Sequence, residues 1–344
     1  MKKTISILLA LLLIFALAAC GGNPATTTTP PATGTAPATP TGTPPATPTG
    51  TAPTESTPPA SIAPGTGITI AVGSKDFTEQ LILGQITMQA LAAHGFTVAD
   101  KTNVAGSNTC RDALTSGAFD IYWEYTGTAW LSLLGHDTVP TGGAQALYDA
   151  VKAEDAGNNV VWLDPAPLND TYALVMQKDK ADALNIKTYK DLANYIDQNP
   201  NKLVLCCDQE FTARPDGLPG LVSTYDMNFG NSLNIMDMGL AYQALQNKQA
   251  DVAMVFATDG RIAQYGLVVL QDDKDFFPAY NAAACIRSDV LAKAPQIADI
   301  LNPIAPLLTT EVMQQLNIQV DGPDARDPKD VAHDWLVQNG FINS

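Results

Sequence analysis

Asp120-Ile-Tyr-Trp-Glu-Tyr-Thr-Gly-Thr-Ala-Trp130 is the stretch that decides the fold, because it has the pattern of a strand that ends abruptly at Thr-Gly-Thr. Alternation along a strand puts Trp123 and Tyr125 on one face and Tyr122 and Glu124 on the other. The turn that follows leaves these aromatic residues at the carboxyl edge of a sheet. Open α/β sheets bind ligands at that edge, so we expect this strand end to face a ligand.

A second stretch repeats the pattern of the first. Residues 111–120 precede Tyr125 and residues 242–251 precede Phe256, and each stretch has an Ala-Leu pair and a closing aspartate five residues before the aromatic. Two explanations stay open on this pattern alone. Helix-turn-strand units share such residues by chance, or the chain contains two similar halves that face each other.

Strand and helix patterns alternate on both sides of this stretch. An apolar strand at 68–72 leads through a loop into a helix over 78–94, which Gly95 ends. A strand that begins at 96–98 and a helix near 108–116 come next. This alternation is typical of parallel α/β proteins.

The alternation continues to the end of the chain. Strands are predicted at 160–163, 172–177, 203–206, 252–256, 267–270 and 282–286, helices near 145–156, 190–198 and 239–247 and after 288, and a loop over 211–219. No glycine pattern of a dinucleotide or phosphate-binding loop is present.

The N-terminal 65 or so residues are not expected to join the folded core. Lys2, Lys3 and an apolar run end in Leu17-Ala-Ala-Cys20, which is typical of a lipoprotein signal over residues 1–20 with Cys20 as the lipidated residue. An ordinary signal peptide with an incidental cysteine is the alternative. Residues 21–66 are rich in Thr, Pro and Ala, which predicts a disordered tether, and its residues 23–65 reach at most about 130 Å in a polyproline-like conformation.

Charge and length narrow the classes of function. The chain has 344 residues and a formal net charge of −16, which argues against nucleic acid as a partner. The part beyond the tether is long enough for one large or two modest domains. His94, His136 and His333 lie in no setting that resembles a catalytic triad, so the chain is not expected to be an enzyme.

Four cysteines follow Cys20. Outside the cytoplasm they can oxidise, and their three full pairings cannot be told apart by spacing. We expect a Cys206–Cys207 bridge and a Cys110–Cys285 bridge. A metal site is not expected, because no histidine lies near any of these cysteines.

Six short motifs occur in order between residues 67 and 340. They are Ser74-Lys-x-Phe-Thr-Glu-Gln80, Trp123-Glu-Tyr-Thr-Gly-Thr128, Asn169-x-Thr-Tyr172, Arg214-Pro-Asp-Gly-Leu-Pro-Gly220, Thr258-Asp-Gly-Arg261 and Asp272-Asp-x-x-Phe-Phe-Pro-x-Tyr280. As a set they resemble the substrate-binding proteins of ABC importers for osmoprotectants, which take up glycine betaine, choline, carnitine and their relatives.

The resemblance implies a two-lobed α/β fold, the type II periplasmic-binding-protein fold, with two chain crossovers between the lobes. The crossovers would fall near Asn169 to Tyr172 and near Tyr280. Residues 67–170 and 281–344 would form lobe one, and residues 171–280 would form lobe two.

By the same resemblance, an aromatic cage falls on Tyr125, Tyr172, Phe256 and Tyr280. A quaternary ammonium has no hydrogen to donate, so it is recognised by the electron-rich faces of rings rather than by hydrogen bonds. Each well-placed ring contributes about 0.5 to 2 kcal/mol. Phe256 stands where relatives often have tyrosine.

The resemblance also assigns three residues to a ligand carboxylate. Arg214 would bind it bidentately, and Lys75 and Thr128 would complete the contact. Arg214 therefore favours a betaine-like zwitterion over choline. Glu124 and Asp259 are expected to have structural roles.

The implied function is capture of a quaternary ammonium solute, with glycine betaine as the first choice. A monomer anchored to the outer face of the cell membrane would deliver the solute to an ABC permease and its ATPase, without a cofactor. Choline, carnitine and proline betaine are alternative ligands. An adhesive lipoprotein on a stalk is the alternative class.

Overall fold

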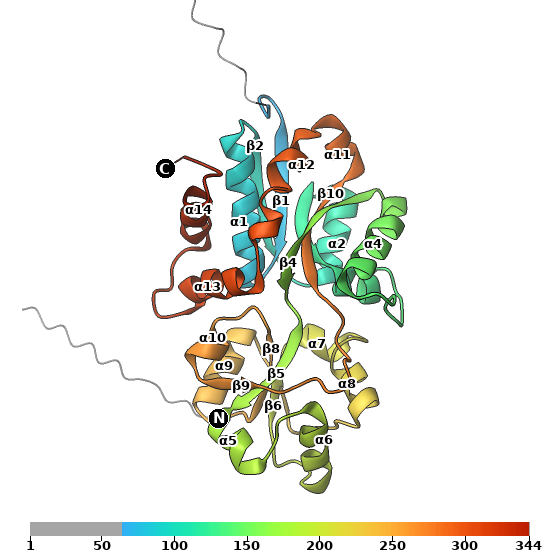
Figure 1. Cartoon of the computed structure of the whole chain (residues 1–344), viewed down its shortest axis with the longest axis vertical. Coiled ribbons are helices and arrows are strands. Elements are labelled where there is room, and N and C mark those ends of the chain that lie inside the picture. Colours follow the sequence, from blue (N-terminus) through green and yellow to red (C-terminus); the bar gives the residue numbers. More distant parts are fainter. Residues whose placement is uncertain (1–63, 344) are drawn as a thin grey trace, which may run out of the picture. The chain divides into compact units, whose positions relative to one another are not determined.

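Two five-stranded sheets form the framework of the protein (Figure 1). The structure is a computed structural model that describes residues 64–343, so the expected signal, Cys20 and nearly all of the expected tether lie outside the described residues. Among the described residues, no helix has the length and apolar character needed to cross a membrane.

The first sheet has the order β2-β1-β3-β10-β4. Its strands are β1 (Thr69–Lys75), β2 (Thr97–Val104), β3 (Ile121–Tyr125), β4 (Val160–Asn169) and β10 (Asn281–Arg287). Strand β1 runs parallel to β2 and β3, whereas β10 runs antiparallel to both β3 and β4. The sheet is therefore mixed, because its second-last strand is contributed by a distant part of the chain.

The second sheet has the order β7-β6-β8-β5-β9. Its strands are β5 (Tyr172–Gln177), β6 (Leu205–Cys207), β7 (Leu233–Ile235), β8 (Val252–Phe256) and β9 (Leu267–Val269). Strand β6 is parallel to β7 and β8, and β5 is antiparallel to β8 and β9. The parallel arrangement expected from the sequence is thus correct only for part of each sheet.

The chain passes from the first sheet to the second between Asn169 and Tyr172 and returns before Asn281. These two connections are bonded to each other: the Asp170 N–H donates to the Tyr280 carbonyl oxygen (3.1 Å), and the Tyr280 N–H donates to Asn169 Oδ1 (2.7 Å). The two crossovers therefore lie side by side.

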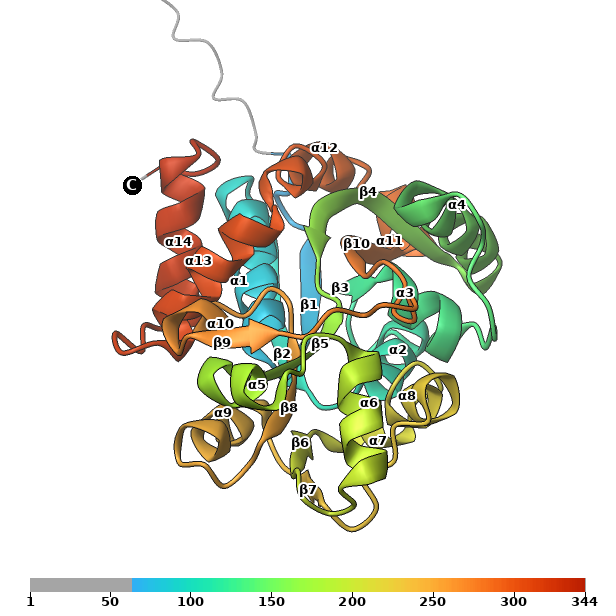
Figure 2. The same cartoon turned by 60° about the horizontal axis from the view of Figure 1, so that its bottom comes forward.

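Helices flank each sheet (Figures 1 and 2). Around the first sheet they are α1 (Thr78–Ala93), α2 (Ser107–Ser116), α4 (Gly143–Asp155), α11 (Ser288–Lys293), α12 (Gln296–Leu301), α13 (Thr310–Asp321) and α14 (Pro328–Gln338). Around the second they are α5 (Lys178–Leu184), α6 (Tyr189–Gln198), α7 (Gln209–Ala213), α8 (Leu218–Tyr225), α9 (Met238–Gln246) and α10 (Arg261–Gln264). The C-terminal helices α13 and α14 pack beside α1.

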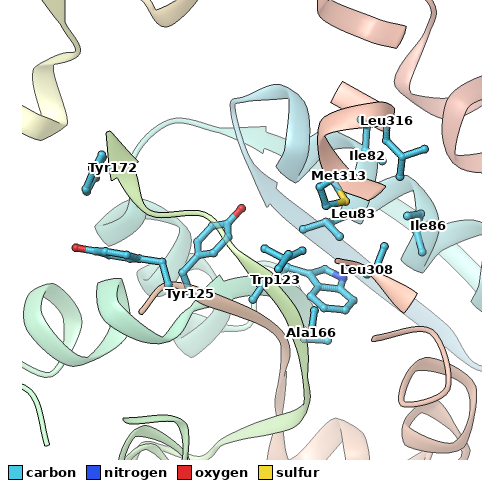
Figure 3. Close-up of a cluster of buried hydrophobic side chains, with 14 of the residues drawn as sticks. Ile82, Leu83, Ile86, Trp123, Tyr125, Ala166, Tyr172, Leu308, Met313 and Leu316 are labelled. Carbon is cyan, nitrogen blue, oxygen red and sulfur yellow. The ribbon is translucent and has the colours of Figure 1, made fainter. Parts of the chain in front are cut away.

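Strand β3 has the two faces that its alternation predicts. Trp123 and Tyr125 belong to one buried cluster, whereas Tyr122 belongs to another and donates its hydroxyl to Glu124. The indole of Trp123 donates to Thr87 of α1 at 2.8 Å. Figure 3 shows Trp123 among aliphatic side chains, with Tyr125 farther along the same strand.

The loop expected over residues 211–219 is wrong, because two short helices, α7 and α8, overlap this range. Asp208 caps α7 by accepting a hydrogen bond from the Phe211 N–H at 2.7 Å. Pro219 lies in the first turn of α8, where proline is well tolerated because its missing N–H would have no partner in the helix. A stretch rich in Pro and Gly therefore begins helices here instead of excluding them.

The expected disulfides are also wrong, since all four described cysteines are free and buried. Cys206 and Cys207 follow each other in β6, so their side chains point to opposite faces of the sheet and enter different clusters. The thiols of Cys110 and Cys285 instead donate to backbone carbonyl oxygens.

Candidate ligand-binding site

A cavity of about 820 Å³ is lined by residues from both sheets. All seven residues that the sequence assigned to a ligand line it: Lys75, Tyr125, Thr128, Tyr172, Arg214, Phe256 and Tyr280. Residues that are up to 205 positions apart in the chain, such as Lys75 and Tyr280, therefore meet at one place.

Strand ends place three of the aromatic residues, and the crossover before β10 places the fourth, Tyr280. Tyr125 ends β3 and Phe256 ends β8, and Tyr172 is the residue of β5 that pairs directly with Phe256. The centres of the Tyr172 and Phe256 rings lie 5.4 Å apart, and the Tyr280 ring meets the Tyr172 ring edge-on at 5.6 Å. The two similar strand ends seen in the sequence thus reach one cavity from different sheets.

Phe77 is a fifth ring at the cavity, and the sequence reasoning missed it. Its ring stacks on Phe256 at 5.1 Å and on Tyr125 at 6.3 Å, so it joins the rings of the two strand ends. Phe77 comes just after the end of β1, and Tyr125 is the last residue of β3, which runs parallel to β1. Both residues therefore lie at the carboxyl edge of the first sheet. Because open α/β sheets bind ligands at that edge, the sequence could have pointed to Phe77.

Arg214 is surrounded by acceptors from the protein itself. Its Nε and Nη2 donate to Asp216 at 2.8 and 2.5 Å, its Nη1 donates to Glu210 at 2.9 Å, and its Nη2 also donates to Thr128 at 3.2 Å. Tyr280 donates its hydroxyl to Asp216 at 2.7 Å. The Nε and Nη2 edge of Arg214 therefore holds Asp216 in this structure.

Lys75 is paired with Glu124 at 2.6 Å, and both side chains are buried. Glu124 also accepts hydrogen bonds from the Tyr122 hydroxyl and the Tyr125 N–H. The Lys75 ammonium lies 5.0 Å from the centre of the Tyr125 ring. This ion pair fixes the strand end that carries the ring.

Two more carboxyl groups lie next to the rings. The Tyr125 hydroxyl donates to Glu79 at 2.7 Å, and the Thr258 hydroxyl donates to Asp170 at 2.6 Å. Burial raises the pKa of Glu79 and, more strongly, the pKa of Asp170, which the charge of Glu79 raises further. Asp170 lines the cavity, whereas Glu79 lines a smaller cavity of about 190 Å³ beside it.

The arrangement suits a ligand that combines a methylated cation with a polar group. Five aromatic rings line the cavity and can attract a quaternary ammonium through their faces, and Arg214 stands near Thr128 and Tyr172. In the region 64–343, no cluster of three or more His, Cys, Asp or Glu side chains is placed to hold a metal ion.

Comparison with known proteins identifies the family. Residues 68–338 match the model of the substrate binding domain of ABC-type glycine betaine transport system. The glycine-betaine-binding protein of Pseudomonas aeruginosa is 39% identical over 282 residues, which cover 80% of this chain and 89% of that protein. The glycine betaine-binding protein YehZ of Escherichia coli is 35% identical over 281 residues, which cover 79% and 91%.

Solved structures agree with this result. A structure described as a glycine betaine/carnitine/choline ABC transporter is 28% identical, has a TM-score of 0.64, and covers 79% of this chain and 99% of its own. The two-lobed α/β fold expected of periplasmic binding proteins is thereby confirmed. From the match over residues 68–338 and the identity to both relatives, this chain belongs to the family of substrate-binding domains of ABC-type glycine betaine transport systems.

Proposed function

We propose that this protein captures glycine betaine in the cavity described above and delivers it to an ABC permease. The observation that carries the proposal is the ring set of Phe77, Tyr125, Tyr172, Phe256 and Tyr280, which lines one cavity from both sheets. Rings of this kind attract a trimethylammonium group through their electron-rich faces. The names of the two relatives support glycine betaine as the ligand.

In this proposal the ligand carboxylate reaches Arg214 at the guanidinium edge that also contacts Thr128. Arg214 is buried, so a hydrogen bond from it to a carboxylate would be charge-assisted and poorly screened by solvent. Asp216 and Glu210 hold the guanidinium in place while they balance its charge. Lys75 acts on the ligand through the position of Tyr125.

We place the protein outside the cytoplasm as a monomeric lipoprotein held by Cys20, with residues 21–66 as the tether. The support is the signal pattern in the sequence and the family of the folded part. Labelling of cells with a radioactive fatty acid tests the anchor: the label is expected on the protein and is expected to disappear in Cys20→Ser.

Titration calorimetry of the full-length protein in a nonionic detergent tests the ligand. Saturable heat with glycine betaine is expected, and proline, which lacks a methylated ammonium, is expected to bind much more weakly. Tyr125→Ala should abolish binding, whereas Tyr265→Ala, a tyrosine that does not line the cavity, should retain it. The proposal fails if no quaternary amine binds at millimolar concentration.

A further inference from the structure

Glu79 and Asp170 are a pair of buried carboxyl groups that Thr258 and Asn317 connect. The Thr258 hydroxyl donates to Asp170 at 2.6 Å, and the Asn317 amide donates to the Thr258 carbonyl oxygen at 3.0 Å and to Glu79 at 3.5 Å. Only 2% of Glu79 and 5% of Asp170 is exposed, although Glu79 comes from the first turn of α1 and Asp170 from the crossover between the sheets. Burial raises the pKa of the Tyr125 hydroxyl, and the neighbouring Glu79 and Asp170 carboxyl groups raise it further. Within residues 64–343, neither carboxyl forms an ion pair with lysine, arginine or histidine.

The groups around the pair do not balance its charge. Lys75, at the end of β1, lowers the pKa of Asp170 but is bound to Glu124. Asp259, which follows β8, adds a further negative charge and is bound to Arg261. The remaining direct partners of the two carboxyl groups are neutral at ordinary pH: the Tyr125 and Thr258 hydroxyls, and the Asn317 amide at 3.5 Å from Glu79.

Asp170 also differs from the other carboxyl groups at the cavity. Asp76, Asp137 and Asp237 are exposed, Asp208 caps α7, and Glu210 is paired with Arg214. Asp170 alone among the described cavity carboxyls is buried and lacks a cationic partner. A cation that enters the ring-lined space would be the first positive charge available to it.

We propose that the Glu79–Asp170 pair supplies the counter-charge for the bound ammonium, and that ligand capture displaces a proton from this pair. The inference rests on the proposed function. In the empty cavity we assign the O–H to Asp170, the member of the pair that lines the cavity, since two buried charges close together are unfavourable. When the ligand cation enters, the O–H bond breaks, the proton leaves to the solvent, and the carboxylate keeps the electron pair.

This coupling makes affinity depend on pH in one direction. The bound cation lowers the pKa of the pair, so the ionised form is the one that binds. Affinity is therefore highest above the pKa of the empty pair and falls as the pH drops through that pKa, by about tenfold per pH unit. The coupling also selects for charge, because an uncharged ligand of the same shape does not displace the proton.

Calorimetry of the full-length protein tests this without any variant. Glycine betaine is titrated in two buffers of different ionisation enthalpy at one pH, and the difference in observed heat gives the number of protons released. We expect release that approaches one proton per ligand below the pKa of the empty pair and vanishes well above it. Binding with no proton release and a constant dissociation constant between pH 4.5 and 8.5 overturns the inference.

A neutral isostere and three variants assign the effect. Choline should bind with the pH dependence of glycine betaine, whereas 3,3-dimethyl-1-butanol, which has the same shape and no charge, should bind independently of pH. Asp170→Asn should remove the proton release and weaken both cations about 10-fold or more, but leave the neutral alcohol unchanged. Asp76→Asn, an exposed carboxyl at the same cavity, should keep the proton release.

Glu79→Gln separates the members of the pair. It removes the repulsion that raises the pKa of Asp170, so the pH dependence should persist with its midpoint at lower pH. If Glu79→Gln abolishes proton release and Asp170→Asn does not, the displaced proton does not come from Asp170, and its assignment to Asp170 is overturned. Failure of the wild type to bind any quaternary amine overturns the proposed function, whereas binding without proton release overturns this inference alone.

Discussion

The carboxylate of Asp216 binds one bidentate edge of the Arg214 guanidinium, at 2.8 Å from Nε and 2.5 Å from Nη2. Both side chains are almost completely buried, at 7% and 2% exposure. The positive charge of Arg214 is therefore balanced inside the protein before any ligand arrives. A betaine carboxylate has to share Arg214 with Asp216, and this limits how strongly the site discriminates between betaines and choline.

Asp216→Asn should increase discrimination in favour of glycine betaine. The amide keeps the shape and removes the negative charge, so Arg214 attracts a ligand carboxylate more strongly and repels choline more strongly. We expect the ratio of the choline to the glycine betaine dissociation constant to rise about tenfold, the scale of one charge-assisted hydrogen bond. Calorimetry with both ligands measures it. Glu210→Gln, at a partner that is 34% exposed, should change the ratio less; an unchanged ratio in Asp216→Asn would contradict the prediction.

Phe77→Ala should weaken glycine betaine binding by about 3- to 30-fold, because it removes one ring from the set and leaves Phe256 and Tyr125 without their shared neighbour. Phe77→Tyr keeps the ring and should bind within about threefold of wild type. Phe341→Ala, whose ring packs on Trp335 away from the cavity, serves as the control. Equal affinities in Phe77→Ala and Phe341→Ala would show that Phe77 is no part of the site.

Lys75→Met should destabilise the protein by about 3 to 5 kcal/mol, since it leaves Glu124 charged and buried without its partner. Urea unfolding followed by tryptophan fluorescence measures the loss. The double variant Lys75→Met with Glu124→Gln should recover much of it. By comparison, Lys178→Met breaks an exposed pair and should leave the free energy of unfolding nearly unchanged. A small effect in the single variant would mean that Lys75 and Glu124 are not coupled in solution.

All four cysteines of residues 64–343 should react with a thiol reagent in denaturant without prior reduction. In the native protein they should react slowly at pH 8, because burial raises the pKa of Cys110 and of Cys207 to about 12 and keeps them as thiols. Alkylation followed by mass spectrometry counts the labelled residues. If two cysteines are labelled in denaturant only after a reductant has been added, one of the expected disulfide bridges is present after all.

The strand ends were predictable from the sequence because they depend on local pattern. The alternation of Trp123 and Tyr125 against Tyr122 follows from the strand period, and the position of Tyr125 and Phe256 at strand ends follows from the turns after them. The family motifs then identified the fold, including the crossing between Asn169 and Tyr172.

The contacts around Arg214 and the cysteines were not predictable in the same way. The partner of Arg214 depends on how residues 214–216 turn between two short helices, and an acceptor two residues away in sequence leaves no periodic signal. The disulfide bridges were expected because the sequence indicates a protein outside the cytoplasm with four cysteines after Cys20. Whether two cysteine side chains meet, however, depends on the direction of each one, which strand register decides. Phe77 was overlooked because it lies just beyond a strand and not within one.

The position of β10 in the first sheet has a consequence for the order of folding. In that sheet β10 lies between β3 and β4, so β4 joins the sheet only through β10. Strand β10, however, comes more than 100 residues after β4 in the chain. The second sheet, in contrast, is complete once β9 has emerged at Val269. We therefore expect the middle segment to fold first, whereas the earlier segment completes its sheet only after β10 has joined it.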